Sequence, residues 1–273
     1  MIKWLCIFLL LPSLLMGEVD TLDHVDSIYD CALSPNTVGC CKESGSCYKV
    51  NLGRSGFWYV GRQPVSPYYI FTTLAGLHLG SRDSLGLDSV FFVANCYSDV
   101  SVDSTLELYV NPLLKDIVTV TDTLQFRYGH YWEDHCGNEI NDSSPTYQYQ
   151  IYDSTDNVII TWGSAGAVKK DVDFNSSVFD SITLNGTGWH RIPIYNCVME
   201  AFRNGDTYVD MIFRDKESYF TLAPFHINGG KKGGYMNFYS RNWAFGEDVI
   251  VIFYYSDEEV TTTGRRARML KGN

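Results

Sequence analysis

The chain has 273 residues, of which 45% are hydrophobic, 15% aromatic and only 19% charged, a composition that excludes a disordered protein. Its formal net charge is −11, and the last ten positions hold four basic residues and no acid, so the rest of the chain is strongly acidic. Such a body would repel phosphate backbones, which argues against a nucleic-acid partner.

Residues 1–17 predict a cleavable secretory signal peptide. Lys3 gives the segment a positive start, an apolar run follows from Trp4 to Met16, and Gly17 is a small residue suited to the cleavage position. The run is too short to span a bilayer comfortably, although an uncleaved anchor is the alternative. We therefore leave residues 1–17 out of the fold and expect a secreted protein.

Residues 18–56 form an acidic, cysteine-rich segment. It contains many turn formers and too few apolar residues to build a core, so we expect disulfides to hold it in shape. Zinc is the alternative for the front cysteines, but their spacing contains no Cys-x-x-Cys pair. Seven cysteines remain after the signal peptide, an odd number that predicts one free thiol or one bond to another chain. The disulfide candidates are Cys31, Cys40, Cys41, Cys47, Cys96, Cys136 and Cys197.

From residue 57 onward, short runs of aromatic and β-branched residues predict strands separated by turns. The region 57–121 is expected to contribute to or precede the main sandwich, with a long loop over 75–89. Its strands are predicted at 57–60, 68–74, 90–97, 105–110 and 117–121.

Residues 122–260 predict the main β-sandwich. Alternation of apolar and polar residues at 124–128 and 147–151 indicates half-buried strands. Asn204-Gly205 suits a type I′ turn, so we expect a hairpin of strands 197–203 and 206–213. Further strands are predicted at 219–223, 235–239 and 249–255, and no amphipathic helix longer than a few turns is expected. The predicted fold class is mostly β: an antiparallel, lectin-like β-sandwich or jelly roll behind a disulfide-rich N-terminal segment.

Three Asn-x-Ser/Thr sequons begin at Asn141, Asn175 and Asn185. None has proline in the middle position, and each lies in a polar, turn-like stretch. In a secreted chain we expect a glycan on at least one of them, which would mark a surface loop.

The chain shows no pattern typical of a metal site or of catalysis. His130 and His135 flank Glu133 and Asp134, but the spacing matches neither arrangement of a zinc-binding helix, and on a strand the two histidines point to opposite faces. A nucleophile elbow, a phosphate-binding loop and a dinucleotide fingerprint are all missing. We therefore predict no catalytic residue, no metal and no cofactor.

Aromatic side chains are the candidate binding residues, because flat rings stack on sugar faces and anchor protein interfaces. The alternative is that they fill the core. Trp189 follows the sequon at Asn185 closely, which favours a surface position for this residue. The candidates are Trp132, Trp162, Trp189, Trp243, Tyr235 and Tyr239.

Residues 261–273 form a basic tail in which Arg265 and Arg268 complete an Arg-x-x-Arg sequence. This sequence is similar to the cleavage site of furin-like proprotein convertases, which would cut after Arg268. The threonine run at 261–263 and Gly264 predict an exposed, flexible segment. A merely basic tail is the alternative.

Signal peptide, cysteine-rich front, aromatic β-body, sequons and convertase-like site together resemble a viral surface glycoprotein ectodomain. The layout is similar to virion glycoproteins of insect-infecting RNA viruses and, loosely, to the N-terminal attachment domain of coronavirus-type spikes. The resemblance implies a virion-surface or secreted protein that binds a host receptor protein or a glycan. It also implies a tether, either a membrane-anchored partner chain or a disulfide-linked oligomer. A host secreted lectin-like or adhesion module and a secreted hydrolase are the alternatives.

Overall fold

Thirteen strands and one helix make up the regular structure in the described part of the chain. The structure is a computed structural model that describes residues 17–22, 28–33, 57–62, 70–100, 106–114, 149–153, 158–216, 235–239 and 249–256. The elements are β1 (Val19–Leu22), β2 (Ile28–Leu33), β3 (Phe57–Arg62), β4 (Ile70–His78), β5 (Leu87–Val100), β6 (Leu106–Pro112), β7 (Tyr149–Asp153), β8 (Val158–Thr161), β9 (Asp180–Leu184), β10 (Gly188–Pro193), α4 (Tyr195–Asn204), β11 (Tyr208–Asp215), β12 (Tyr235–Tyr239) and β13 (Ile250–Tyr255).

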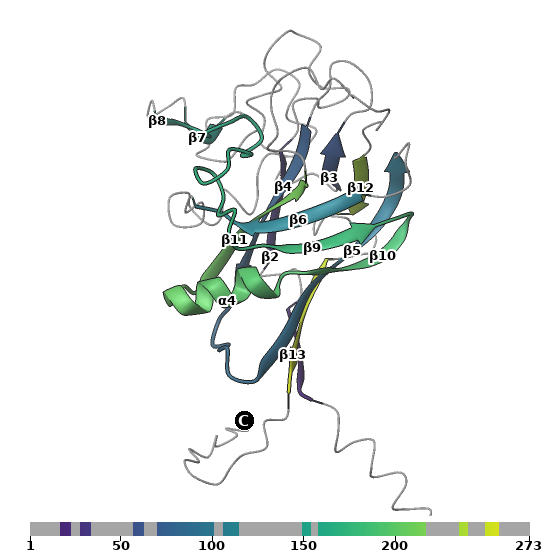
Figure 1. Ribbon diagram of the computed structural model, residues 1–273, viewed down its shortest axis with the longest axis vertical. Helices are drawn as coiled ribbons and strands as arrows, with labels where there is room; N and C mark the ends of the chain where they lie inside the picture. Colours follow the sequence, from purple (N-terminus) through teal and green to yellow (C-terminus); the bar gives the residue numbers. More distant parts are fainter. Residues whose placement is uncertain are drawn as a thin grey trace, which may run out of the picture.

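Eleven of these strands form two antiparallel layers that are joined at one corner, and β7 and β8 form a separate two-stranded sheet (Figure 1). In the first sheet β13 and β12 pair with successive parts of one edge of β5, and β10 pairs with the opposite edge. β1 lies beyond β13, and β3 lies beyond β12. The second sheet contains β4, β11, β6 and β9 in that order, with β2 on the other edge of β4. The start of β4 pairs with the end of β3, which connects the layers. The prediction of a mostly antiparallel β-sandwich is therefore confirmed.

The main core lies between the two sheets because each strand directs every second side chain inward. On β12, Met236 and Phe238 are buried in this core, whereas residues 235, 237 and 239 face outward. Trp58 of β3 stacks on Phe238 with ring centroids 4.2 Å apart, and it also contacts Phe92 of β5. Strands that are far apart in the sequence thus meet around one indole ring.

The segment predicted as the first strand of a hairpin is the helix α4. Its residues Cys197, Val198 and Ala201 are buried against the core, which is a helical rather than an alternating pattern. Gly205 has φ 76° and ends the helix by donating its N–H back to the last turn. The prediction failed because Asn-Gly suits a helix end as well as a type I′ turn, since both need a positive φ. The following strand, β11, is close to its predicted position.

The N-terminal segment contributes more to the fold than its composition predicts. β1 pairs with β13, β2 pairs with β4, and Leu22, Ile28 and Leu33 are all buried. The expectation that this region builds no core is therefore wrong for 19–22 and 28–33. The predicted loop at 75–89 is also too long, because β4 continues to His78 and β5 begins at Leu87. β4 is buried along almost its whole length and therefore lacks alternation, and it contains the small residues Ala75 and Gly76, which are not typical of strands.

The segment 162–174 covers the outer face of the second sheet. Trp162, Ala167 and Phe174 pack on Leu74 and Ile212, forming a second apolar cluster. The buried carboxylate of Asp173 holds this segment together, because it accepts the backbone N–H groups of Gly163, Ser164 and Lys169 at 2.6, 3.1 and 2.9 Å. The second sheet is therefore buried on both faces here.

Candidate functional site: an aromatic face on the first sheet

The outer face of the first sheet carries the tyrosine patch, which we define as Tyr59, Tyr97, Tyr235, Asn237 and Tyr239. Strand register explains the assembly: Asn237 of β12 lies opposite Tyr59 of β3 on one side and Ser98 of β5 on the other. A bulge in β5, where the register shifts between Asn237 and Phe238, leaves Tyr97 as the extra residue. All four tyrosines are partly exposed.

Ring contacts fix the tyrosines relative to one another. The rings of Tyr97 and Tyr239 stack with centroids 4.8 Å apart. Phe71 of β4 contacts the other pair, with its ring centroid 6.0 Å from that of Tyr59 and 5.0 Å from that of Tyr235, and is itself only 7% exposed. Aromatic rings held in this way lose little conformational entropy when a ligand binds them.

Asn237 is the unusual member of the tyrosine patch. Its side chain is only 7% exposed, and its Oδ1 atom has no hydrogen-bond partner. An unpaired buried acceptor costs about 1–3 kcal/mol, and most buried polar atoms in proteins are paired. A ligand with an O–H or N–H group would supply the missing donor.

Two phenols of the tyrosine patch, those of Tyr59 and Tyr97, are neutral near pH 7. Burial, followed by the neighbouring tyrosines Tyr59, Tyr239 and Tyr235, raises the pKa of Tyr97 well above its usual value. Burial, and then Tyr235, likewise raises the pKa of Tyr59. Both phenols therefore keep their protons and can donate as well as accept hydrogen bonds.

Trp189 lies at the rim of the same face. It pairs with Asn95 on β5, two residues before Tyr97, and its side chain is 55% exposed. A diagonal neighbour on adjacent strands lies about 7–8 Å away, within reach of a tryptophan ring. Further along this face, the guanidinium of Arg191 covers the rings of Phe91 and Tyr254 at 4.8 and 5.2 Å.

Two of the three sequons lie in the described part of the chain, and both are outside the sheets. Asn185 is exposed in the turn between β9 and β10, where a Cβ added at Gly186 or Gly188 would meet nothing within 4 Å. Asn175 is partly buried and precedes β9. Asn141 lies outside the described residues.

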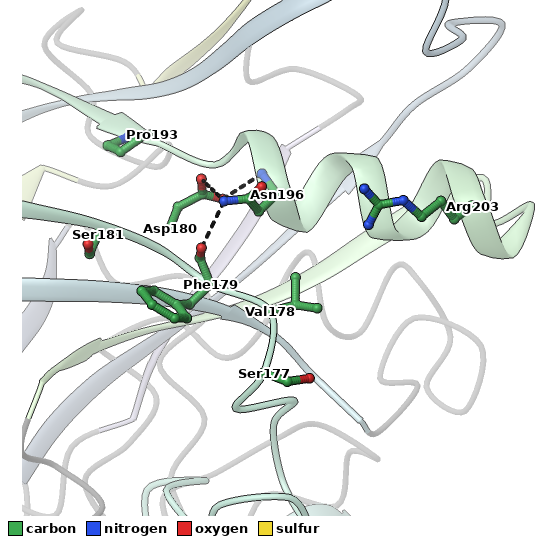
Figure 2. A pocket seen from close by; sticks show the side chains of 8 residues that line it. All are labelled: Ser177, Val178, Phe179, Asp180, Ser181, Pro193, Asn196 and Arg203. Atoms are coloured by element: carbon green, nitrogen blue, oxygen red, sulfur yellow. Dashed lines mark hydrogen bonds between the residues drawn. The ribbon is translucent and has the colours of Figure 1, made fainter.

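An open cavity of about 630 Å³ lies between α4 and the start of β9 (Figure 2). Its walls include Ser177, Phe179 and Ser181 from the β9 side and Asn196 and Arg203 from α4. Phe179 is 42% exposed, and the side-chain amide of Asn196 donates to its backbone oxygen at 2.9 Å.

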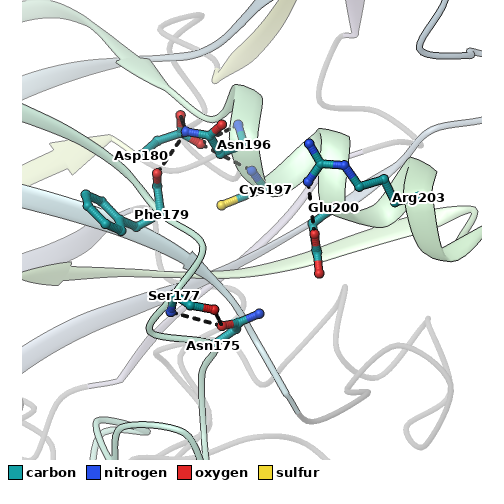
Figure 3. A network of polar contacts seen from close by, with 8 residues as sticks. All are labelled: Asn175, Ser177, Phe179, Asp180, Asn196, Cys197, Glu200 and Arg203. Atoms are coloured by element: carbon teal, nitrogen blue, oxygen red, sulfur yellow. Dashed lines mark hydrogen bonds and ion pairs between the residues drawn. The ribbon is translucent and has the colours of Figure 1, made fainter.

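The carboxylate of Asp180 forms the buried wall of this cavity and caps α4. Its Oδ2 accepts the backbone N–H groups of Asn196 and Cys197 at 2.8 and 3.2 Å (Figure 3). The residue before the helix, Ile194, provides no side-chain cap, so Asp180 satisfies these N–H groups from a different element. Burial raises the pKa of Asp180 despite these hydrogen bonds.

Replacing Asp180 by alanine should lower the free energy of unfolding by about 2 kcal/mol, because two N–H groups at the helix start lose their acceptor. Urea unfolding followed by circular dichroism measures this loss. Asp88→Ala is the control, since Asp88 is an exposed residue of β5, and it should change stability by less than about 0.5 kcal/mol. Equal losses in the two variants would contradict the capping role.

The structure places some of the candidate aromatic residues at the surface and one of them in the core. Tyr235 and Tyr239 belong to the tyrosine patch, and Trp189 is at the surface as its position in the sequence predicted. Trp162 is only 4% exposed and packs in the second apolar cluster, so it is not accessible to a ligand. Trp132 and Trp243 lie outside the described residues. The sequence interpretation missed Tyr59, Tyr97 and Asn237, although the alternation from 235 to 239 was a usable signal.

Two of the seven disulfide candidates are buried free thiols. Cys96 lies in β5 and Cys197 in α4, and each Sγ contacts a backbone oxygen at 3.5 Å, that of Ser98 and that of Val110 respectively. Burial raises the pKa of Cys96 to about 11 and also raises the pKa of Cys197. Their assignment as disulfide candidates is therefore corrected: these thiols are core residues. Cys31 lies in β2, and Cys40, Cys41, Cys47 and Cys136 are outside the described residues.

The remaining predicted features give no further site. Gly17 lies two residues before the start of β1. The predicted strands at 117–121, 124–128 and 219–223, the His130–His135 tract, and Arg265 and Arg268 lie outside the described residues. In the part of the chain that the structure describes, no helix has the length and apolarity that crossing a bilayer requires. No protein-family model matches the chain, and no curated protein sequence is significantly similar to it.

Proposed function

We propose that the chain is a secreted or virion-surface glycoprotein that binds a neutral carbohydrate of its receptor through the tyrosine patch. The observation that carries the proposal is the unpaired Oδ1 of Asn237, buried among four tyrosines whose rings are already ordered. Most buried polar atoms in native proteins are paired, so an unpaired acceptor calls for an explanation, and a bound ligand that donates to it is one.

The chemistry of the tyrosine patch favours a sugar. The flat apolar face of a pyranose ring stacks on tyrosine, its hydroxyls exchange hydrogen bonds with protonated phenols, and one hydroxyl can donate to Asn237. The five members of the patch carry no charge, so an anionic sugar would find no cationic partner among them. Trp189 would extend the surface at the rim, next to the turn that carries Asn185.

The proposal predicts that the secreted protein binds neutral glycans on an array and that Tyr97→Ala weakens this binding at least tenfold, because a stacked ring is lost from the centre of the site. Titration by isothermal calorimetry with the best glycan measures the effect. Tyr208→Ala is the control, because Tyr208 lies in β11 of the second sheet, stacked on His78 at 4.6 Å.

Three results would overturn the carbohydrate assignment. The first is a folded, secreted protein that binds no glycan, and the second is binding that Tyr97→Ala leaves unchanged. The third is binding of receptor-bearing cells that persists after their glycans are removed, which would identify a protein receptor. Turnover in ester or glycoside panels would instead support the alternative of a secreted hydrolase.

A further inference from the structure

The side chain of Asn175 is held in one orientation by its own sequon. Its Oδ1 accepts the backbone N–H of Ser177 at 3.0 Å and the hydroxyl of Ser177 at 2.7 Å (Figure 3). The backbone is fixed as well, since the N–H of Asn175 donates to Pro112 and its oxygen accepts from Asn111, both at 2.9 Å. In the described residues the side-chain Nδ2, the atom that carries a glycan, makes no hydrogen bond.

The cavity that begins two residues later offers a surface for a sugar. One face of the Phe179 ring stacks on Tyr109 with centroids 5.2 Å apart, and the ring remains 42% exposed. The walls of the cavity also carry hydroxyl, amide and guanidinium groups, on Ser181, on Asn196 at the start of α4 and on Arg203 toward the other end of this helix (Figure 2). The volume of about 630 Å³ falls within the range of pockets that hold small organic ligands.

We propose that the first sugars of a glycan on Asn175 fold back into this cavity and stack on Phe179, so that the glycan becomes part of the fold. This inference rests on the proposed secretory route but not on the tyrosine patch. An exposed aromatic ring that would otherwise face water is then covered by the apolar face of N-acetylglucosamine, and the polar groups around it bond the sugar hydroxyls.

The attachment itself follows the usual chemistry of a sequon. Asn175 Nδ2 forms a bond to the sugar C1 of a lipid-linked oligosaccharide, the bond from C1 to the diphosphate breaks, and the amide loses one proton. The lipid diphosphate leaves with the electron pair of the broken bond, so no oxidant or reductant takes part.

Asn185 provides an internal comparison. A glycan there would extend from an exposed turn, since a Cβ placed at Gly186 or Gly188 meets no atom within 4 Å. We therefore expect the two glycans to differ: the one on Asn175 stabilises the folded state, and the one on Asn185 does not.

The test is a thermal-unfolding cycle on full-length protein secreted from a eukaryotic cell, with site occupancy measured by mass spectrometry of glycopeptides. Asn175→Gln should lower the Tm by about 2–4 °C, whereas Asn185→Gln should leave it unchanged. In a Phe179→Ala background, Asn175→Gln should lower the Tm by clearly less, because the ring that the glycan covers is already gone and only the bonds from Ser177 to Asn175 Oδ1 are still lost. Phe179→Tyr keeps the ring and should restore the dependence on Asn175.

An unoccupied Asn175 overturns the proposal, and so does an occupied Asn175 whose removal shifts the Tm equally with and without the Phe179 ring. Neither result concerns the tyrosine patch, whose test is glycan binding in solution. If only the proposed function fails, the protein binds no glycan on the array. The Tm effects of the Asn175 and Phe179 substitutions would then still be non-additive, as this inference predicts.

Discussion

Trp58→Ala is expected to lower the free energy of unfolding by about 4 kcal/mol, the largest loss of stability that we predict. Trp58 is 1% exposed, and its ring contacts Phe92, Phe213 and Phe238, which come from strands of both sheets. Its Nε1 also donates to the backbone oxygen of Tyr239 at 3.1 Å. Truncation therefore opens a cavity at the centre of the core and releases one end of the tyrosine patch.

Urea unfolding monitored by fluorescence and circular dichroism measures this effect, and two variants serve as controls. Trp58→Phe keeps an aromatic ring in the core and should lose only about 1–2 kcal/mol, which corresponds to the lost N–H donor and some repacking. Trp189→Ala removes the same side chain from a position that is 55% exposed, and it should change stability by less than about 0.5 kcal/mol. Similar losses for Trp58→Ala and Trp189→Ala would show that the indole of Trp58 is not at the core.

The sequence predicted those strands whose residues have a strong intrinsic preference for β-structure. The strands near 90–97, 235–239 and 249–255 could be predicted because β-branched and aromatic residues there have few competing structures. The helix α4 could not, because Asn204-Gly205 satisfies two kinds of chain reversal, and burial of Cys197 and Ala201 on one face decides between them. The strands β1 and β2 could not be predicted, because acidic residues in these segments are typical of loops. Their strand structure depends on pairing with β13 and β4, which are remote in the sequence.

The candidate site depends on contacts that are remote in the sequence. Tyr59, Tyr97 and Asn237 come from β3, β5 and β12, and only the register of these strands places them on one face. The buried Asp173 and Asp180 show the same dependence. Each carboxylate accepts backbone N–H groups of another segment, and no sequence motif near either residue predicts these contacts. Burial of Trp162 could not be inferred either, since the segment that holds it is shaped by Asp173.

Asn237→Leu is the second variant with a large expected effect. If the Asn237 oxygen is kept unpaired for a ligand, a leucine of similar size should raise the free energy of unfolding by about 1 kcal/mol, because it removes an unpaired polar atom from a buried position. The same variant should weaken glycan binding at least tenfold, because the hydroxyl that pairs with Oδ1 loses its acceptor. Stability and binding would thus change in opposite directions.

Asn111→Leu is the matched control, because Asn111 is fully buried but fully paired. Its Oδ1 accepts from Arg214 Nε at 2.9 Å, and its Nδ2 donates to the backbone oxygens of Asn175 and Val178 at 2.9 Å each. The same substitution here should lower the free energy of unfolding by about 3 kcal/mol, because it removes a hydrogen-bond partner of the buried Arg214 Nε and of two partly buried backbone oxygens.

The most direct measurement of the central claim is therefore glycan affinity and unfolding free energy determined side by side for the unaltered protein and Asn237→Leu. We predict a more stable variant that no longer binds. A variant that is less stable, or one that binds as tightly as the unaltered protein, would contradict a carbohydrate site built around Asn237.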